Sequence, residues 1–216
     1  MGAWSNAAWQ AAQPVYEKII AHPFVAELAA GTLSQERFRF YLRQDALYLA
    51  HYAEVLAHTA SRLGRRDFTA DFLRFASDGM AVEKALHESY LGGDVPAHGE
   101  ISPACMLYTS VLRAQATAPA EVEAAAVLPC FWVYRRVGEE ILSRRSGDGN
   151  PYSRWIETYA DPAFAASTDR AIEICDALAD AAGSRTRELM TDIFVLCTRM
   201  EWMFWDSAYR LEKWRI

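Results

Sequence analysis

A cysteine that follows a proline inside a helical pattern is the first feature of this sequence that suggests chemistry. In VLPCFWVYRRVGEEIL, Pro129 removes a backbone amide donor and clashes with the preceding turn, so we expect a kink immediately before Cys130. Cys130 and Tyr134 lie at i and i+4, so the thiol and the phenol point the same way and could present a nucleophile to a pocket. The alternative is an inert core cysteine, because free cysteine is among the most buried residue types.

A carboxyl group in the aromatic-rich segment RMEWMFWDSAYRLEKW is the second such feature. Glu201 shares a predicted helix face with Phe204 and Trp205, at i, i+3 and i+4. A carboxyl surrounded by aromatic rings tends to have a raised pKa, which suits a general acid. Alternatively, Glu201 pairs at the surface with Arg199 or another cation.

A second carboxyl group lies beside two phenols in FYLRQDALYLAHYAEVL. Asp45, Tyr48 and Tyr52 fall at i, i+3 and i+7, so they share one helix face among apolar neighbours. If that face is buried, the acid needs partners, since buried unpaired charge is strongly disfavoured. The alternative is a solvated aspartate beside two core tyrosines.

Histidines and glutamates on two neighbouring helices form a rival, metal-like constellation. His51, Glu54 and His58 lie on one predicted helix, and Glu83 and His87 lie at i and i+4 on the next. Carboxylate and imidazole suit iron or manganese. Di-iron bundles, however, usually use Glu-x-x-His, whereas both pairs here are Glu-x-x-x-His. We therefore expect no metal site and interhelical hydrogen bonds from these histidines.

The elements that position these residues are predicted to be helices throughout. Apolar residues recur at spacings of three or four, and strand-like alternation is not sustained anywhere. Ser34, Ser102 and several Gly and Pro residues supply starts and stops. We predict about eight helices in one all-α bundle forming a single domain over 1–216, with a loop over 147–151. Besides a segment around Trp9, the expected helices are 34–63, 67–92, 103–117, 119–145, a short one containing Trp155 and Tyr159, 162–182 and 184–214.

Bulk composition narrows the class of protein. The net charge is −6, and no run of Lys or Arg could neutralise successive phosphates, so a nucleic acid is a poor candidate partner. The four cysteines form no C-x-x-C pair, which argues against a zinc knuckle or a redox motif. No signal peptide and no apolar run of membrane-spanning length is evident. We expect a soluble, cytoplasmic protein without membrane partners.

Five segments together resemble the TenA family, also called thiaminase II. They occur in the family's order over nearly the whole chain: RFRFYLRQDALYLAHYAEVLA, PACMLYTSVL, VLPCFWVYRRVGEEI, YSRWIETYADPAF and MEWMFWDSAYRLEKW. The resemblance implies a bundle of the haem-oxygenase-like kind without haem, a deep pocket between helices and a homotetramer. It places the chain in the branch that has a cysteine, rather than a glutamate, as nucleophile.

The resemblance also implies roles for single residues. Cys130 matches the nucleophile, Glu201 the acid/base carboxyl, and Asp45 the carboxylate that binds the amino edge of a pyrimidine. The residues that match the ring-walling positions are Tyr48, Tyr108, Tyr134, Tyr159 and Phe204. The implied activity is hydrolysis of a 4-amino-5-aminomethyl-2-methylpyrimidine in thiamin salvage, without a cofactor and with thiamin as a further candidate substrate. The alternatives are a metal- or quinone-dependent oxidase and a non-catalytic pyrimidine-binding or regulatory protein.

Overall fold

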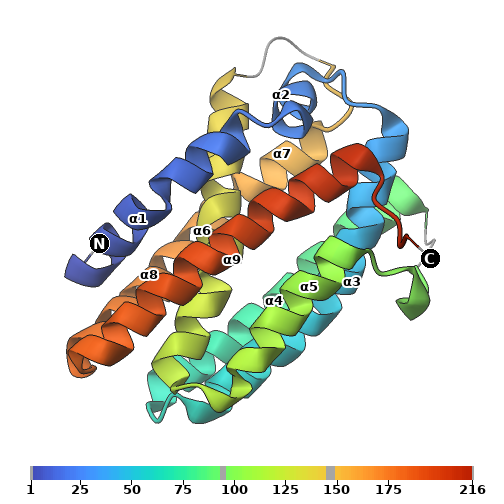
Figure 1. Cartoon of the computed structure of the whole chain (residues 1–216). Helices are drawn as coiled ribbons and strands as arrows, with labels where there is room; N and C mark the ends of the chain where they lie inside the picture. Colours follow the sequence, from blue (N-terminus) through green and yellow to red (C-terminus); the bar gives the residue numbers. More distant parts are fainter. Residues whose placement is uncertain (1, 93–95, 145–148, 216) are drawn as a thin grey trace.

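The chain folds into a bundle of helices. The computed structural model describes residues 2–92, 96–144 and 149–215, without the side chains of 81–87. These residues contain no strand, and none of their helices is long and apolar enough to cross a membrane. Their α-helices (Figure 1) are α1 (Ala3–Ile20), α2 (Pro23–Ala30), α3 (Gln35–Arg62), α4 (Arg66–Leu91), α5 (Pro103–Ala114), α6 (Ala120–Arg144), α7 (Ser153–Tyr159), α8 (Pro162–Ala181) and α9 (Ser184–Arg210). Short 3₁₀ helices span His98–Glu100 and Gln115–Thr117.

Several helices begin or end at local signals in the sequence. The hydroxyls of Ser34 and Ser102 each accept a hydrogen bond from the backbone amide three residues later, at 3.3 Å. The carboxylate of Asp161 accepts one at 2.7 Å from the amide two residues later. These bonds satisfy amides that a helix start leaves without an intrahelical partner. Gly92 ends α4 in the left-handed conformation, with φ of 61°.

The N-terminal segment differs from the single predicted helix. It forms two helices because His22 and Pro23 interrupt it: the Nδ1 atom of His22 accepts the amide of Phe24 at 3.1 Å, and Pro23 occupies the first turn of α2. Pro129, by contrast, does not end a helix, since α6 continues through it. Residues 147 and 148 of the predicted loop lie outside the described residues.

The predicted helices over 103–117 and 184–214 both prove too long. After Ala114 the chain tightens into the 3₁₀ helix Gln115–Thr117. At the C-terminus, α9 ends at Arg210 because Leu211 turns into the left-handed region, with φ of 53°. The chain then folds back, and the indole of Trp214 donates to the carbonyl of Ile101 at 2.8 Å. This long-range contact has no local sequence signal.

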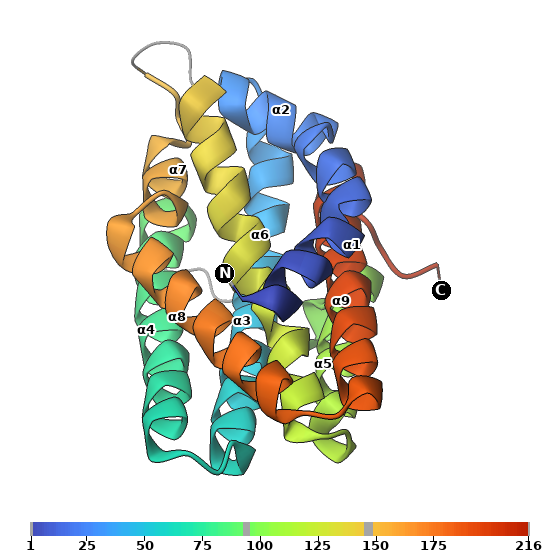
Figure 2. The same cartoon turned by 90° about the vertical axis from the view of Figure 1, so that its left-hand side faces the viewer.

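Helix α6 runs through the middle of the bundle, as Figure 2 shows, with α1 and α9 on one side and α4 and α8 on the other. Helix α3 packs against α4, while α6 packs against both α8 and α9. Buried apolar side chains from these helices join into one hydrophobic cluster. At its centre the ring of Trp205 stacks on Tyr41, with centroids 5.0 Å apart.

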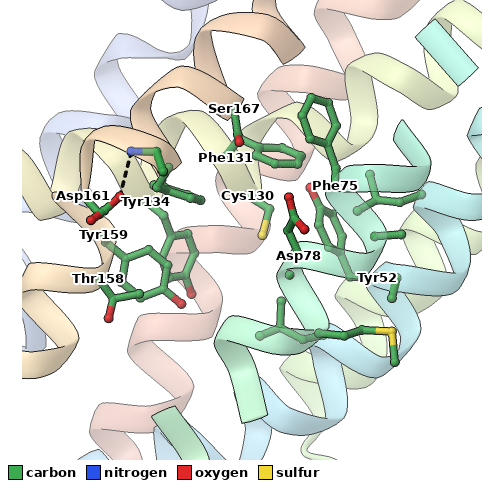
Figure 3. Close-up of a pocket in the computed structure, with 18 of the residues that line it drawn as sticks. Tyr52, Phe75, Asp78, Cys130, Phe131, Tyr134, Thr158, Tyr159, Asp161 and Ser167 are labelled. Carbon is green, nitrogen blue, oxygen red and sulfur yellow. Dashed lines mark hydrogen bonds between the residues drawn. The ribbon is translucent and has the colours of Figure 1, made fainter. Parts of the chain in front are cut away.

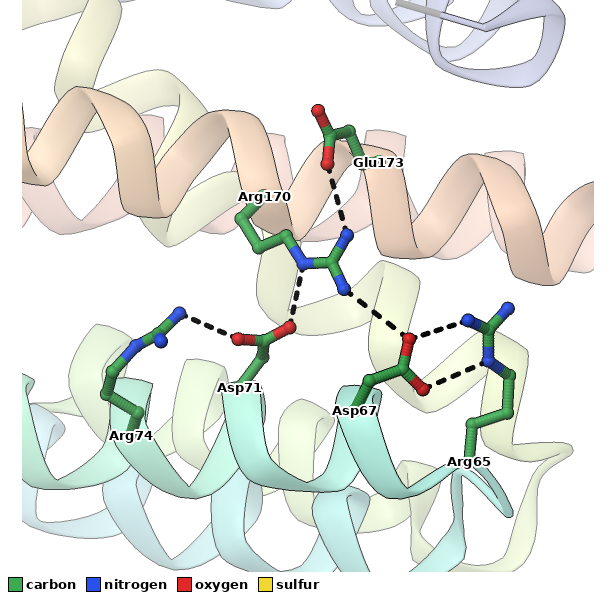
Figure 4. A network of polar contacts seen from close by, with 6 residues as sticks. All are labelled: Arg65, Asp67, Asp71, Arg74, Arg170 and Glu173. Atoms are coloured by element: carbon green, nitrogen blue, oxygen red, sulfur yellow. Dashed lines mark hydrogen bonds and ion pairs between the residues drawn. The ribbon is translucent and has the colours of Figure 1, made fainter.

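Ion pairs connect α4 and α8 (Figure 4). The Nε atom of Arg170 on α8 donates to Asp71 on α4 at 2.7 Å, and its guanidinium lies 3.6 Å from the carboxylate of Asp67. Arg65, just before α4, binds Asp67 at 2.6 Å, and Arg74 within α4 binds Asp71 at 2.7 Å. The network therefore connects two helices that are far apart in the sequence.

Candidate active site

A pocket of about 550 Å³ lies between α3, α4, α6, α7 and α8. Most of its lining is apolar, and aromatic side chains face it from all five helices (Figure 3). These side chains are Tyr52, Phe75, Phe131, Tyr134, Tyr159 and Phe164. A concave, ring-lined space with a few polar groups is the usual form of a small-molecule site. A flat heterocycle would find faces for stacking there.

Cys130 presents its thiol to this pocket from the middle of α6. It is half-buried, whereas Cys105, Cys175 and Cys197 are buried in the core. Burial and the nearby Glu201 carboxyl raise the pKa of the Cys130 thiol well above its ordinary value, while the hydroxyls of Tyr48 and Tyr52 lower it in part. The resting group is therefore a protonated thiol at neutral pH.

Glu201 is buried in α9 rather than ion-paired at the surface, with 1% of the residue exposed. The hydroxyl of Tyr108 donates to its Oε1 atom at 2.7 Å. Burial raises the pKa of Glu201 to about 8, the Tyr108 hydrogen bond lowers it, and the charge of Asp45 raises it. Glu201 thus holds a proton over most of the neutral range, as a general acid requires.

Asp45 projects from α3 into the pocket although only 2% of the residue is exposed. Tyr134 and Tyr159 line the same pocket, with ring centroids 5.0 Å apart. The hydroxyl of Tyr41, which the sequence analysis did not single out, donates to the hydroxyl of Tyr134 at 3.4 Å. A carboxylate that is held away from water but borders a cavity can bind donors on a ligand.

The other predicted site residues lie behind the pocket surface. Tyr48 packs against Tyr108 at 4.8 Å and against Phe204 at 5.8 Å between ring centroids. Neither these three rings nor Glu201 borders the cavity. The eight predicted residues thus come together in one region, with Cys130, Asp45, Tyr134 and Tyr159 at the pocket surface and the other four in a buried layer.

Several residues that line the pocket are not among the predicted site residues. Tyr52 lies on the predicted helix face of Asp45, and its hydroxyl donates to the Val127 carbonyl at 2.8 Å. Phe75 and Asp78 on α4 and Phe164 on α8 also border the pocket. Their sequence context shows only helical periodicity, so no local signal distinguishes them from other residues of amphipathic helices.

The metal-like constellation is divided among ion pairs. His58 on α3 contacts the buried carboxylate of Glu123 on α6 at 2.7 Å, which is an interhelical bond of the kind expected. Glu54 and His51 both contact Arg113, the latter at 2.6 Å. The side chains of Glu83 and His87 lie outside the described residues. Among the side chains that the structure describes, no three His, Cys, Asp or Glu groups are arranged to hold a metal ion.

Comparisons with known proteins identify the class to which this fold and site belong. The solved TenA homologue from P. horikoshii superposes with a TM-score of 0.85 at 25% identity, covering 96% of this chain and 98% of that one. A Shewanella denitrificans domain with a heme oxygenase-like fold gives a TM-score of 0.70 at 14% identity, covering 94% and 90%, which shows the fold alone. The predicted all-α, haem-oxygenase-like fold is confirmed.

Sequence comparisons then give the family. The aminopyrimidine aminohydrolase of Bacillus subtilis is 32% identical, covering 94% of this chain and 89% of that protein. The thiamine biosynthesis multifunctional protein ThiED of Corynebacterium efficiens is 35% identical over 97% of this chain, which spans only 29% of that protein. The profile of the TENA/THI-4/PQQC family matches residues 9–211. The chain belongs to this family.

Proposed function

We propose that the protein hydrolyses 4-amino-5-aminomethyl-2-methylpyrimidine to the hydroxymethylpyrimidine and ammonia, as a step of thiamin salvage. The observation that carries the proposal is a thiol facing a ring-lined pocket with a protonated carboxyl buried behind it. The names of the relatives support the substrate class, since the Bacillus subtilis protein is an aminopyrimidine aminohydrolase.

Asp45 is proposed to bind the amino edge of the pyrimidine. A carboxylate accepts hydrogen bonds only, and an exocyclic amino group donates them. The aromatic side chains around it would cover the faces of the ring. Tyr134 and Tyr159, whose hydroxyls come from α6 and α7, would complete the contacts at the ring edge.

Cys130 is proposed to add to the unsubstituted ring carbon beside the carbon that bears the aminomethyl group. As the S–C bond forms, the adjacent ring nitrogen gains the proton of Glu201, and Glu201 takes the proton of the thiol. The addition is then neutral overall, which fits two groups that are both protonated in the resting site. This transfer removes the need for a standing thiolate in a buried environment.

Breaking the aromatic system lets the amine leave. The lone pair of the 4-amino group forms a C=N bond, the ring double bond shifts to the exocyclic methylene, and ammonia departs with a proton from that amino group. Water adds to the methylene and returns a proton to the imine nitrogen. The sulfur then leaves, the ring nitrogen gives its proton back through Glu201, and the aromatic ring is restored. The net reaction exchanges an amine for a hydroxyl, with all atoms balanced.

A turnover assay with two substrates tests the proposal. The protein is incubated with the aminomethylpyrimidine or with thiamin, and ammonia, the thiazole and hydroxymethylpyrimidine are measured. We expect release of ammonia and the hydroxymethylpyrimidine from the first substrate. Cleavage of thiamin at a comparable rate would make the vitamin a second substrate. Tight pyrimidine binding without any turnover would favour the non-catalytic alternative, and turnover that required added iron or manganese would favour the oxidase.

We also propose that residues 1–216 form a single domain that assembles as a homotetramer in the cytoplasm. The single hydrophobic cluster supports one domain, and the family resemblance supports the tetramer. Light scattering of the purified protein measures the assembly, and a mass of one or two chains at micromolar concentration would contradict it. Limited proteolysis that released a stable fragment would contradict the single domain.

A further inference from the structure

The pocket has two ends of different chemical character. At the inner end lie Cys130, Asp45 and Tyr134, which are buried or half-buried. At the outer end, the charged side chains of Asp78, Arg154 and Asp161 are exposed. The volume of about 550 Å³ falls in the range of about 300–1,000 Å³ typical of drug-sized ligands. A single six-membered ring with three small substituents would leave the outer end unfilled.

Gly79 borders the outer end from within α4. Glycine is the least favourable residue after proline in a helix interior. Its backbone does not require glycine, since its φ is not positive, and a Cβ atom there would meet no other atom within 4 Å. Neither packing nor conformation therefore explains this glycine, whereas the space that it leaves beside the pocket would accommodate part of a ligand.

Asp78, the preceding residue, gives this space its charge. Figure 3 shows its carboxylate pointing toward the space that the Cys130 sulfur faces. Asp161, whose carboxylate also accepts the Ala163 amide at the start of α8, adds a second carboxylate to the exposed lining, and Arg154 supplies a guanidinium. Among the lining residues that the structure describes, the exposed charges are acidic on balance, so the outer end attracts ammonium groups and repels anions, more strongly at low salt.

We propose that the outer end of the pocket is the subsite for the leaving group, that Gly79 provides its room, and that Asp78 makes it select amines that are uncharged or cationic over those that carry an anion. This inference rests on the proposed function, because the leaving group is defined by cleavage at the aminomethyl carbon. It adds to that function the residues that set the size and the charge of the leaving group.

Four substrates with the same pyrimidine test the proposal: the parent amine and its N-(2-aminoethyl), N-(2-hydroxyethyl) and N-carboxymethyl derivatives. In the unaltered protein, we expect kcat/KM for the carboxymethyl derivative to be at least about tenfold below that for the aminoethyl derivative. Asp78→Asn should narrow this ratio by about three- to tenfold, and more at low ionic strength. Asp180→Asn is the matched control, because it removes the same charge from an exposed position of α8 outside the pocket.

Gly79→Leu tests the room in the subsite. We expect the ratio of kcat/KM for the hydroxyethyl derivative to kcat/KM for the parent amine to fall about tenfold or more. Gly79→Ala, which tests the change in helix propensity, should lower this ratio less. Either of two results would overturn the subsite while hydrolysis of the parent amine stands. One is an equal loss of kcat/KM for both substrates in Gly79→Leu. The other is an unchanged ratio of kcat/KM between the aminoethyl and carboxymethyl derivatives in Asp78→Asn. Absence of parent hydrolysis in the unaltered protein would instead overturn the proposed function.

Discussion

The inner and outer walls of the pocket differ in how far their polar groups are removed from water. The inner wall, from α3 and α6, holds Asp45 and Cys130 among packed rings, and Glu201 of α9 is buried behind it. Burial is the largest cause of the raised pKa of both Cys130 and Glu201. The outer wall, from α4, α7 and α8, carries exposed charges such as Asp78 and Arg154. Proton transfer benefits from desolvated groups with shifted pKa values, whereas selection among leaving groups can operate with solvated charges.

Removing the thiol from the inner wall should have the largest effect. For Cys130→Ser we expect a loss of turnover of about a thousandfold or more, because a hydroxyl is a far weaker nucleophile than sulfur. The rate of ammonia release from the aminomethylpyrimidine measures this loss, and pyrimidine binding should remain measurable. Cys105→Ser is the matched control, since Cys105 is buried away from the pocket. Full activity in Cys130→Ser would remove the nucleophile from the proposal.

Glu201→Gln should have the next largest effect on turnover. We expect kcat/KM to fall by about 10²–10⁴-fold, the range typical of a general acid or base. The acid form of Glu201 predominates below a pKa of about 8, so turnover by the unaltered protein should decline as the pH rises through that value. The variant should lack this decline. A pH–rate profile with the same basic limb in both proteins would assign that limb to another group.

The same substitution has a separate consequence for stability. The pKa of Glu201 is raised from 4.5 in the unfolded chain to about 8 in the folded one, so the contribution to stability is complete below pH 4.5 and is lost as the pH rises through 8. A rise of this size corresponds to roughly 5 kcal/mol as an upper bound. Glutamine does not ionise, so Glu201→Gln should gain stability relative to the unaltered protein between pH 5 and 9. Urea unfolding at several pH values measures the gain, and a difference independent of pH would contradict it.

Asp45→Asn should weaken binding without removing the nucleophile. A hydrogen bond to a charged group contributes about 1.5–3 kcal/mol, so we expect the dissociation constant of the aminopyrimidine to rise by roughly ten- to a hundredfold. Calorimetry in the Cys130→Ser background separates binding from turnover. The control is Asp180→Asn in that background, for which we expect unchanged binding. Equal affinities with and without the Asp45 carboxylate would place the amino edge elsewhere in the pocket.

The sequence predicts the inner wall better than the outer one. Cys130 follows a mid-helix proline, and Asp45 and Glu201 stand among aromatic residues, so each has an unusual local context. The helix that carries Asp45 begins at the Ser34 cap, a signal that a short stretch of chain determines by itself. Family resemblance then assigns their roles.

Which predicted residues reach the pocket surface is decided by packing between helices. Tyr48 and Tyr108 have the same residue type as Tyr134, yet they lie in the layer behind the pocket. Phe75 and Asp78 reach the pocket because α4 lies opposite α7 and α8, and nothing in their own segment indicates that. The fold-back of Trp214 onto Ile101 is likewise a tertiary contact. Periodicity gives the faces of helices but not their neighbours.

Breaking the ion pairs between α4 and α8 should have the smallest effect of these changes. It tests whether the outer wall can lose a contact without changing the chemistry at the inner wall. Arg170 is 34% exposed and Asp71 is 13% exposed at their side chains, so the pair is only partly shielded from water and salt. For Arg170→Met we expect a loss of about 1 kcal/mol, which lowers Tm by about 2–4 °C for a chain of this size. The loss should shrink at high salt.

Arg185→Met is the matched control for this prediction, because Arg185 pairs with Glu188 within α9 and joins no two helices. Its Tm should change less than that of Arg170→Met. Turnover of the parent amine by Arg170→Met should stay within about twofold of the unaltered protein, since no desolvated group of the inner wall loses a contact. If Arg170→Met instead lowered turnover as far as Glu201→Gln does, the position of α4 would control the chemistry at Cys130, and the two walls would act as one unit.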